Sequence, residues 1–239
     1  MIGIDTDETR VVGLNAGRSH VSDVSDNQLA AAGLKQSMLP GGNKTASAGL
    51  LPHSLEPSYR QKSGCLEATT DLDVLSHVDA VIVCVPTPLS KGKDPDMTAV
   101  ISATDAIASH LHPGMVVVLE STTYPGTTEE TIVPLIENLG FKIGQNFYIG
   151  YSPEREDPGN KNYTTKTIPK VVSGYTKNCL HITQTLYDAI VDTTVPVKST
   201  RVAEMTKILE NIHRAVNIGL VNELKMVADK MDIDIYEVI

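Results

Sequence analysis

The stretch AVIVCVPTPLSKGKDPDMTAVISATDAIASHLHPGMVVVL, residues 80–119, shows most directly how this chain folds. It begins with a β-branched apolar run at 80–85, continues with helical periodicity at 97–112, and ends with a second apolar run at 115–119. Pro113 and Gly114 mark the end of the helical segment. A strand, a helix and another strand in this order are typical of a βαβ unit, whose parallel strands are buried on both faces.

The same alternation continues on both sides of this stretch. We expect further strands at 1–4, 146–150, 171–172 and 194–197, and further helices at 6–16, 127–139 and 177–190. The sequence therefore predicts an α/β fold with a doubly wound parallel sheet. From Thr200 onward the apolar residues follow helical spacing, which predicts one long helix, then a turn at 231–232 and a new helix at Ile235.

Residues 33–66 break this pattern. They include the run PGGNKTASAG and show no sustained periodicity. We interpret them as a mobile surface insertion, a tolerated loop with no part in the chemistry.

Composition excludes several classes of function. The chain has 239 residues and a formal net charge of −9, whereas a protein that binds nucleic acid needs a basic surface. Cys65, Cys84 and Cys179 form no CxxC pair, which suits a reducing compartment and predicts no metal site. No signal pattern is present, and no apolar run approaches the roughly 20 residues that cross a bilayer. We expect a cytoplasmic globular protein without nucleic-acid or membrane partners.

Asp5 is the first candidate cofactor residue. It follows the strand at 1–4 in the sequence MIGIDTDET. In a doubly wound, Rossmann-like dinucleotide fold, an acidic residue at this position accepts hydrogen bonds from the adenosine ribose and favours NAD over NADP. The alternative is an ordinary cap of the following helix. A strand and a Gly-rich turn precede such a strand in that fold, and because neither is found here, we expect a sheet that lacks its first strand.

Four stretches connect this fold with a known family. They are VIVCVPTPL at 81–89, ESTTYPGTTEE at 120–130, GYSPEREDPGN at 150–160 and AEMTKILENIHRAVNIGLVNEL at 203–224. Together with NAGRSHVSDVSD at 15–26, they closely resemble the UDP-glucose/GDP-mannose dehydrogenase family, and look most like its bacterial UDP-N-acetylglucosamine 6-dehydrogenases. The resemblance implies oxidation of the C6 alcohol of a UDP-sugar to a carboxylate, for surface polysaccharide biosynthesis. The oxidation takes two successive hydride transfers to NAD. The sugar reaches the carboxylate through a thioester that it forms with a catalytic cysteine.

The resemblance also implies roles for residues at three strand ends. Pro86 and Thr87 correspond to cofactor-binding positions, and Thr122 to a threonine that contacts the cofactor and orients a water or alcohol. Glu154 corresponds to the glutamate that activates water against the thioester. Each has a structural alternative: a strand-ending turn at Pro86 and Thr87, helix capping at Thr122, and a solvated turn at Glu154.

Lys207 and Asn211 lie four residues apart on the long helix, so they share one face with Glu204 and Arg214. By resemblance, Lys207 stabilises the alkoxide and the thiohemiacetal oxyanion, and Asn211 orients water or that oxyanion. A plain solvated stripe is the alternative. The resemblance further implies that residues 1–198 form a partial NAD-binding domain, and that 199–239 begin a central helical domain through which a homodimer assembles. Core packing within one chain is the alternative for this helix.

The family's nucleophile follows the pattern Gly-Gly-His-Cys, and none of the three cysteines lies in that setting. We therefore expect a chain truncated at both ends that is inactive alone. Two alternatives stay open: a UDP-glucose 6-dehydrogenase, with the same chemistry, or a non-catalytic truncated remnant.

Overall fold

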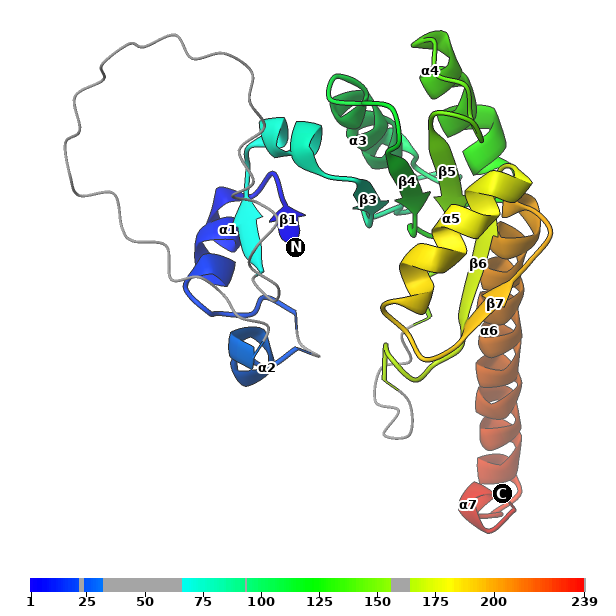
Figure 1. Ribbon diagram of the computed structural model, residues 1–239. Coiled ribbons are helices and arrows are strands. Elements are labelled where there is room, and N and C mark those ends of the chain that lie inside the picture. The colour runs from blue at the N-terminus through cyan, green and yellow to red at the C-terminus, as the bar shows by residue number, and fades with distance from the viewer. Residues whose placement is uncertain (22–23, 32–65, 93, 156–163, 239) are drawn as a thin grey trace, which may run out of the picture. The chain divides into compact units, whose positions relative to one another are not determined.

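The computed structural model describes residues 1–21, 24–31, 66–92, 94–155 and 164–238. The chain divides into two compact units, Met1–Leu72 and Asp73–Ile239 (Figure 1). The predicted insertion at 33–66 lies outside the described residues except for Leu66, so the prediction that it is a mobile loop stays a prediction.

The first unit contains a small parallel β-α-β arrangement. Its elements are β1 (Ile2–Ile4), α1 (Glu8–Asn15), α2 (Asp26–Ala31) and β2 (Glu67–Thr69). β1 pairs in parallel with β2. The side-chain amide of Asn15 accepts a hydrogen bond from Ala68 N (2.9 Å) and donates one to Ala68 O (2.7 Å), which fixes α1 against β2. The predicted strand at 1–4 and helix at 6–16 are confirmed with slightly shorter bounds.

The second unit is built on a five-stranded sheet in the order β3-β4-β5-β6-β7. The strands are β3 (Ala80–Val83), β4 (Val116–Leu119), β5 (Tyr148–Tyr151), β6 (Lys170–Gly174) and β7 (Thr194–Pro196). Each of the five corresponds to a strand that the sequence predicts. β3, β4 and β5 are mutually parallel, and β6 is parallel to β7.

One feature of the predicted sheet is wrong. β6 runs antiparallel to β5, because the described part of the connection at 152–169 contains no crossover helix that would carry the chain to the other end of the sheet. Within the first unit, β1 and β2 pair with each other. The fold is therefore α/β with a mixed sheet, not a purely parallel one.

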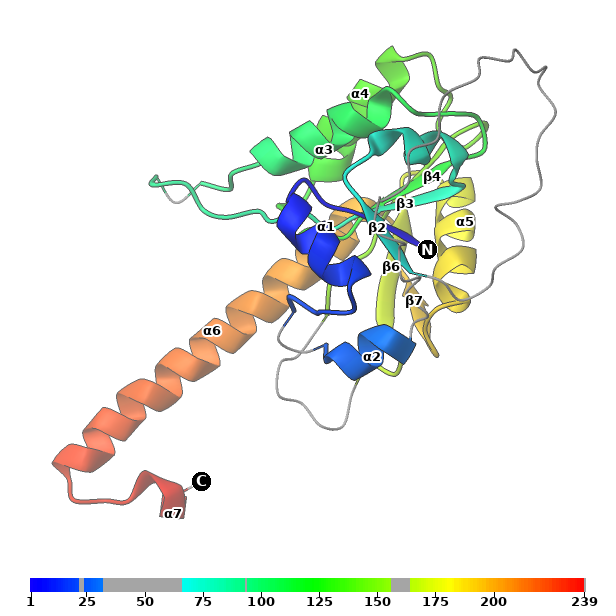
Figure 2. The ribbon, with the colours of Figure 1, turned by 90° about the vertical axis from the view of Figure 1, so that its left-hand side faces the viewer.

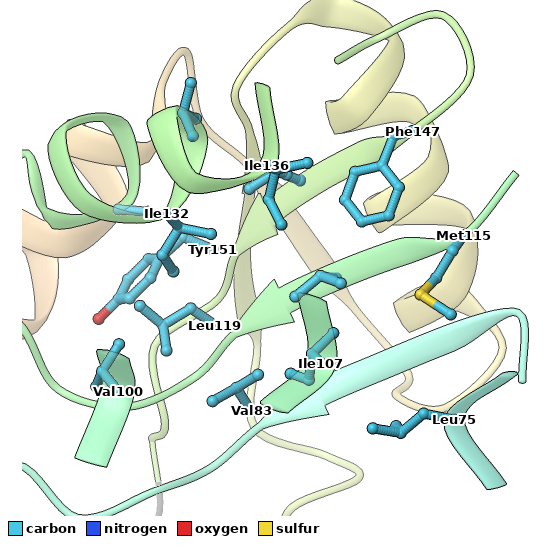
Figure 3. Packing of buried hydrophobic residues seen from close by; sticks show 14 of the residues in the cluster. Leu75, Val83, Val100, Ile107, Met115, Leu119, Ile132, Ile136, Phe147 and Tyr151 are labelled. Atoms are coloured by element: carbon cyan, nitrogen blue, oxygen red, sulfur yellow. The ribbon is translucent and has the colours of Figure 1, made fainter. Parts of the chain in front are cut away.

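Helices cover both faces of the five-stranded sheet (Figure 2). They are α3 (Thr98–Ala108), a π-helical turn (Thr128–Ile132) that continues into α4 (Val133–Asn138), and α5 (Lys177–Asp188), with a 3₁₀ helix (Leu72–His77) before β3. Val117 and Leu119 of β4 pack into the cluster with α3 and α4 (Figure 3), and Val116 and Val118 into the cluster with α5. β4 is thus buried on both faces, as expected for a central strand.

The long helix α6 (Thr200–Lys230) begins after the N-cap Ser199 and is followed by α7 (Ile235–Val238). Its first turns are buried at Ala203, Glu204 and Lys207, whereas most of the helix beyond Asn211 is exposed and extends away from the sheet (Figure 2). Both predicted helices are confirmed. Within the described part of the chain, no helix is long and apolar enough to cross a membrane.

Candidate active site

The carboxyl ends of β3, β4 and β5 lie side by side at one edge of the sheet. Val83 is in register with Leu119, and Leu119 with Tyr151. Thr122 lies three residues after Leu119, and Glu154 lies three residues after Tyr151. The two residues therefore follow paired positions of adjacent strands at the same distance along the chain. Because β6 is antiparallel to β5, its first residue, Lys170, is found at this same edge. The fold thus brings polar side chains from four strand ends to the edge where doubly wound sheets bind their ligands.

Hydrogen bonds join the segments that follow β3 and β4. The hydroxyl of Thr87 donates to the carbonyl oxygen of Thr122 at 2.6 Å. Ser121 Oγ accepts from Val85 N at 3.0 Å and donates to Val85 O at 2.7 Å. These contacts hold Thr87 and Thr122 next to each other, while Pro86 is exposed beside them.

Lys207 and Glu154 form the central pair of the site. The Lys207 ammonium donates to Glu154 Oε2 at 3.0 Å and to the Glu154 carbonyl oxygen at 2.5 Å. Only 9% of the Lys207 side chain is exposed, so the carboxylate compensates a charge that has lost most of its water. Asn211 lies one turn further along α6 and is half-buried. The sequence could indicate that Lys207 and Asn211 share a face, but not that Lys207 contacts Glu154.

A basic pocket of about 390 Å³ adjoins Lys207. Its walls come from α6 and from the segment between β5 and β6: Arg155, Ile168, Lys207, Glu210, His213, Arg214, Asn217 and Ile218. Arg155 pairs with Glu210 at 2.7 Å. The lining contains the cationic side chains of Arg155, Lys207 and Arg214 and the carboxylate of Glu210, and both Arg155 and Lys207 are paired with carboxylates.

Glu204 was expected only as part of a polar stripe, and the structure gives it a different environment. It is fully buried, and its carboxylate accepts from Gly126 N (2.5 Å), Thr128 N (2.9 Å) and Thr128 Oγ1 (2.7 Å). The only signal in the sequence was its spacing of three residues from Lys207.

A second polar cluster surrounds Glu120, directly after β4. Lys170 Nζ lies 2.9 Å from Glu120 Oε1, which also accepts from the Tyr187 hydroxyl. Cys84 Sγ is 3.7 Å from Glu120 Oε2. Burial, and then the negative charge of Glu120, raise the pKa of the Cys84 thiol to about 12. The thiol is therefore protonated at neutral pH, which does not suit a nucleophile.

Asp5 lies in the first unit, directly after β1. Its Oδ1 accepts from Asp7 N at 2.8 Å, and its Oδ2 lies 3.4 Å from Arg10 Nη1. Asp7, not Asp5, is the N-cap of α1. The Asp5 side chain keeps 29% of its surface exposed.

Among the residues that the structure describes, no group of three or more His, Cys, Asp or Glu side chains could hold a metal ion.

Comparison with known proteins identifies the family. Residues 49–191 match the NAD-binding domain of the UDP-glucose/GDP-mannose dehydrogenase family, and residues 201–239 match its central domain. Protein CapL of Staphylococcus aureus is 36% identical over all of this chain and 49% of its own length. The UDP-N-acetyl-D-glucosamine 6-dehydrogenase of Pseudomonas aeruginosa is 40% identical over 71% of this chain and 40% of its own length.

The solved structure of UDP-D-ManNAc dehydrogenase from Pyrococcus horikoshii superposes on the whole chain with a TM-score of 0.79 and 28% identity, and the chain covers 50% of it. The chain thus spans about half the length, or less, of these relatives. The match to the NAD-binding domain ends before the long helix α6, and the match to the central domain begins within it. This chain belongs to the UDP-glucose/GDP-mannose dehydrogenase family, a family of NAD-dependent nucleotide-sugar 6-dehydrogenases.

Proposed function

We propose that this chain supplies the cofactor-binding residues and part of the sugar-binding site of an NAD-dependent UDP-sugar 6-dehydrogenase. The observation that carries the proposal is the buried ammonium of Lys207, which Glu154 holds beside a basic pocket at the carboxyl edge of parallel strands. An ammonium in such a place stabilises negative charge that develops on a substrate oxygen. This is the charge that forms when an alcohol is oxidised.

The proposed roles follow from these positions. NAD, when bound, accepts the hydride that leaves C6 of the sugar. Lys207 stabilises the alkoxide that forms as the C6 hydroxyl gives its proton to water, and later the oxyanion of the thiohemiacetal. Glu154 takes the proton of the water that hydrolyses the thioester. Thr122 orients the alcohol, and Asn211 orients the water or the oxyanion. The thioester requires a cysteine thiol, and we assign this role to none of the three cysteines of this chain.

The basic pocket supports a nucleotide sugar as the substrate. A UDP-sugar carries a diphosphate, and the guanidinium group of Arg214 suits phosphate oxygens better than an ammonium does. We propose UDP-N-acetylglucosamine because the Pseudomonas aeruginosa relative that carries this name is 40% identical over the matched region. UDP-glucose is the alternative substrate.

We also propose that residues 1–198 are a partial NAD-binding domain and that 199–239 begin a central helical domain. Support comes from the N-cap at Ser199 and from the separate family matches at 49–191 and 201–239.

The test measures NADH production by the protein encoded by the complete reading frame, with UDP-N-acetylglucosamine and with UDP-glucose. Lys207→Ala should lower kcat by about 10²–10³-fold. Arg214→Ala should raise KM for the sugar by about 10- to 100-fold. This increase corresponds to the free energy of one hydrogen bond to a charged group. Lys225→Ala, an exposed cation of α6 outside the pocket, should change neither value.

A preference for UDP-glucose would overturn the proposed substrate. If neither sugar gives NADH, or if Lys207→Ala keeps full activity, the proposed reaction is wrong.

A further inference from the structure

Glu204 is the only charged side chain that the described core buries completely, and it occupies an unusual place between two elements. A buried carboxylate is unfavourable unless hydrogen bonds replace its lost water. Three donors do so here, and all three belong to the short segment Gly126–Thr128 that begins the helix after β4.

The donors explain why the carboxylate is there. The first backbone N–H groups of a helix have no partner within the helix, and the positive end of the helix dipole favours an anion. Thr127 precedes the π-helical turn and makes no capping hydrogen bond with its own side chain. Glu204 therefore caps, from another element, a helix start that would otherwise leave buried N–H groups unpaired.

The same contact determines where Lys207 lies. Glu204 and Lys207 are three residues apart on α6, so they lie on one face within a single turn. Glu204 binds the segment that follows Thr122, and Lys207 binds Glu154 after the neighbouring strand. The first turns of α6 are thus fixed to both strand ends, and a shift of this helix would move the Lys207 ammonium away from Glu154.

We propose that Glu204 is a positioning residue, whose buried carboxylate holds the first turns of α6 in the place where Lys207 reaches the reacting oxygen. The catalytic importance of this placement rests on the proposed function of Lys207. A displacement of about 1 Å in an active site can lower the rate by about 100-fold, so the effect should appear in kcat more than in KM.

The first experiment needs no enzymatic activity. In the unmodified chain, Lys207 is shielded by Glu154 and should react slowly in reductive methylation, measured by mass spectrometry of its peptide. Glu204→Gln keeps the size of the side chain but removes its charge and directs an NH₂ group toward N–H donors. We expect Lys207 to be methylated severalfold faster in this variant.

A matched control uses Arg201, which joins α6 to the π-helical turn directly after this segment through exposed contacts with Glu129 Oε2 (2.6 Å) and Glu130 Oε1 (2.7 Å). Arg201→Gln should leave Lys207 shielded. Thr128→Val removes one of the three donors without changing the charge of Glu204. It should cause a smaller increase and provides a milder variant if Glu204→Gln does not fold.

Unchanged labelling of Lys207 in folded Glu204→Gln, or in Thr128→Val where the first variant does not fold, would overturn the inference. In the protein from the complete reading frame, Glu204→Gln should lower kcat at least tenfold while KM for the sugar stays nearly constant. An equal rise in KM would also contradict a positioning role. If the unmodified protein oxidises no sugar, the proposed function fails, whereas the labelling result still decides whether Glu204 positions Lys207.

Discussion

Cys84 lies beside a carboxylate, and this neighbour determines the chemistry of its thiol. The Cys84 side chain is close to Glu120, which is itself held by Lys170 and Tyr187. Burial is the largest cause of the raised thiol pKa, and the charge of Glu120 is the next. We therefore expect Cys84 to react slowly with electrophiles.

This gives a prediction for alkylation by iodoacetamide at neutral pH. A rise in pKa from 9.0 to about 12 lowers the thiolate fraction by about a thousandfold. A more basic thiolate is also a better nucleophile, which recovers part of that loss. Cys84 in the folded chain should then react about 30-fold more slowly than in the unfolded chain, given a Brønsted coefficient of about 0.5. Mass spectrometry of the Cys84 peptide measures both rates.

The rate should increase as the pH rises toward 12, because the thiolate is the reactive form. Glu120→Gln should accelerate the reaction, since it removes the anion that opposes ionisation. Equal rates in the folded and unfolded chains would show that the thiol is not protected.

Single residues of the site differ in what the sequence could indicate about them. Helical spacing places four polar residues on one face of α6: Glu204, Lys207, Asn211 and Arg214. Periodicity alone therefore does not distinguish a buried member of this set from an exposed one. Their burial differs because only the first turns of α6 lie against the sheet, and that depends on contacts with residues far away in the chain. The contact between Lys207 and Glu154 and the burial of Glu204 both result from the packing of α6 against the sheet. A local sequence pattern cannot predict this packing.

At the level of elements, the long apolar strands and the regular helices could be predicted from the sequence. The short strand β2 and the antiparallel direction of β6 could not. The runs at 80–85 and 115–119 are continuous β-branched stretches, which is how a strand buried on both faces appears. β2 has three residues, of which only Ala68 is buried, so it leaves no periodic signal. The antiparallel direction of β6 leaves no signal in the residues of β6 itself, because the direction of a strand is not encoded in its own apolar pattern.

The helix start at Gly126 supplies a prediction at this scale. Gly126 has φ +107°, and a Cβ there would lie 2.7 Å from Glu130 Oε1 and 3.1 Å from Arg201 Nη1. Gly126→Ala should therefore lower the free energy of unfolding by about 1–3 kcal/mol, from backbone strain and from disturbance of the contacts between α6 and this turn. Urea unfolding of the chain measures the change.

Gly219→Ala is the matched control, because Gly219 lies inside α6 with no heavy atom within 4 Å of the added Cβ. Alanine favours the helix more than glycine, so this variant should gain up to about 1 kcal/mol. A destabilised Gly219→Ala or an unchanged Gly126→Ala would contradict the argument.

At the level of the whole molecule, the second unit is stabilised by two apolar clusters on opposite faces of its sheet, whereas most of α6 takes part in neither. The exposed fractions of Val216, Leu220 and Leu224 are 62%, 56% and 49%, at spacings of four residues on the helix. Monomeric proteins rarely expose a continuous apolar surface of this kind. We therefore propose that a second copy of the chain covers this apolar stripe of α6.

The pair of substitutions Leu220→Glu and Leu224→Glu tests this proposal. Burying one such side chain contributes about 1.5–3 kcal/mol, and in a two-fold symmetric dimer each substitution occurs twice. The double variant should therefore sediment as a monomer at concentrations where the unmodified chain associates. Asn222→Glu combined with Lys225→Gln lowers the charge of each chain by the same two units at neighbouring exposed positions of α6 and should leave association intact, which separates the loss of apolar contact from simple charge repulsion. An unmodified chain that sediments as a monodisperse monomer at high concentration would mean that the exposed apolar residues of α6 do not bind a second copy.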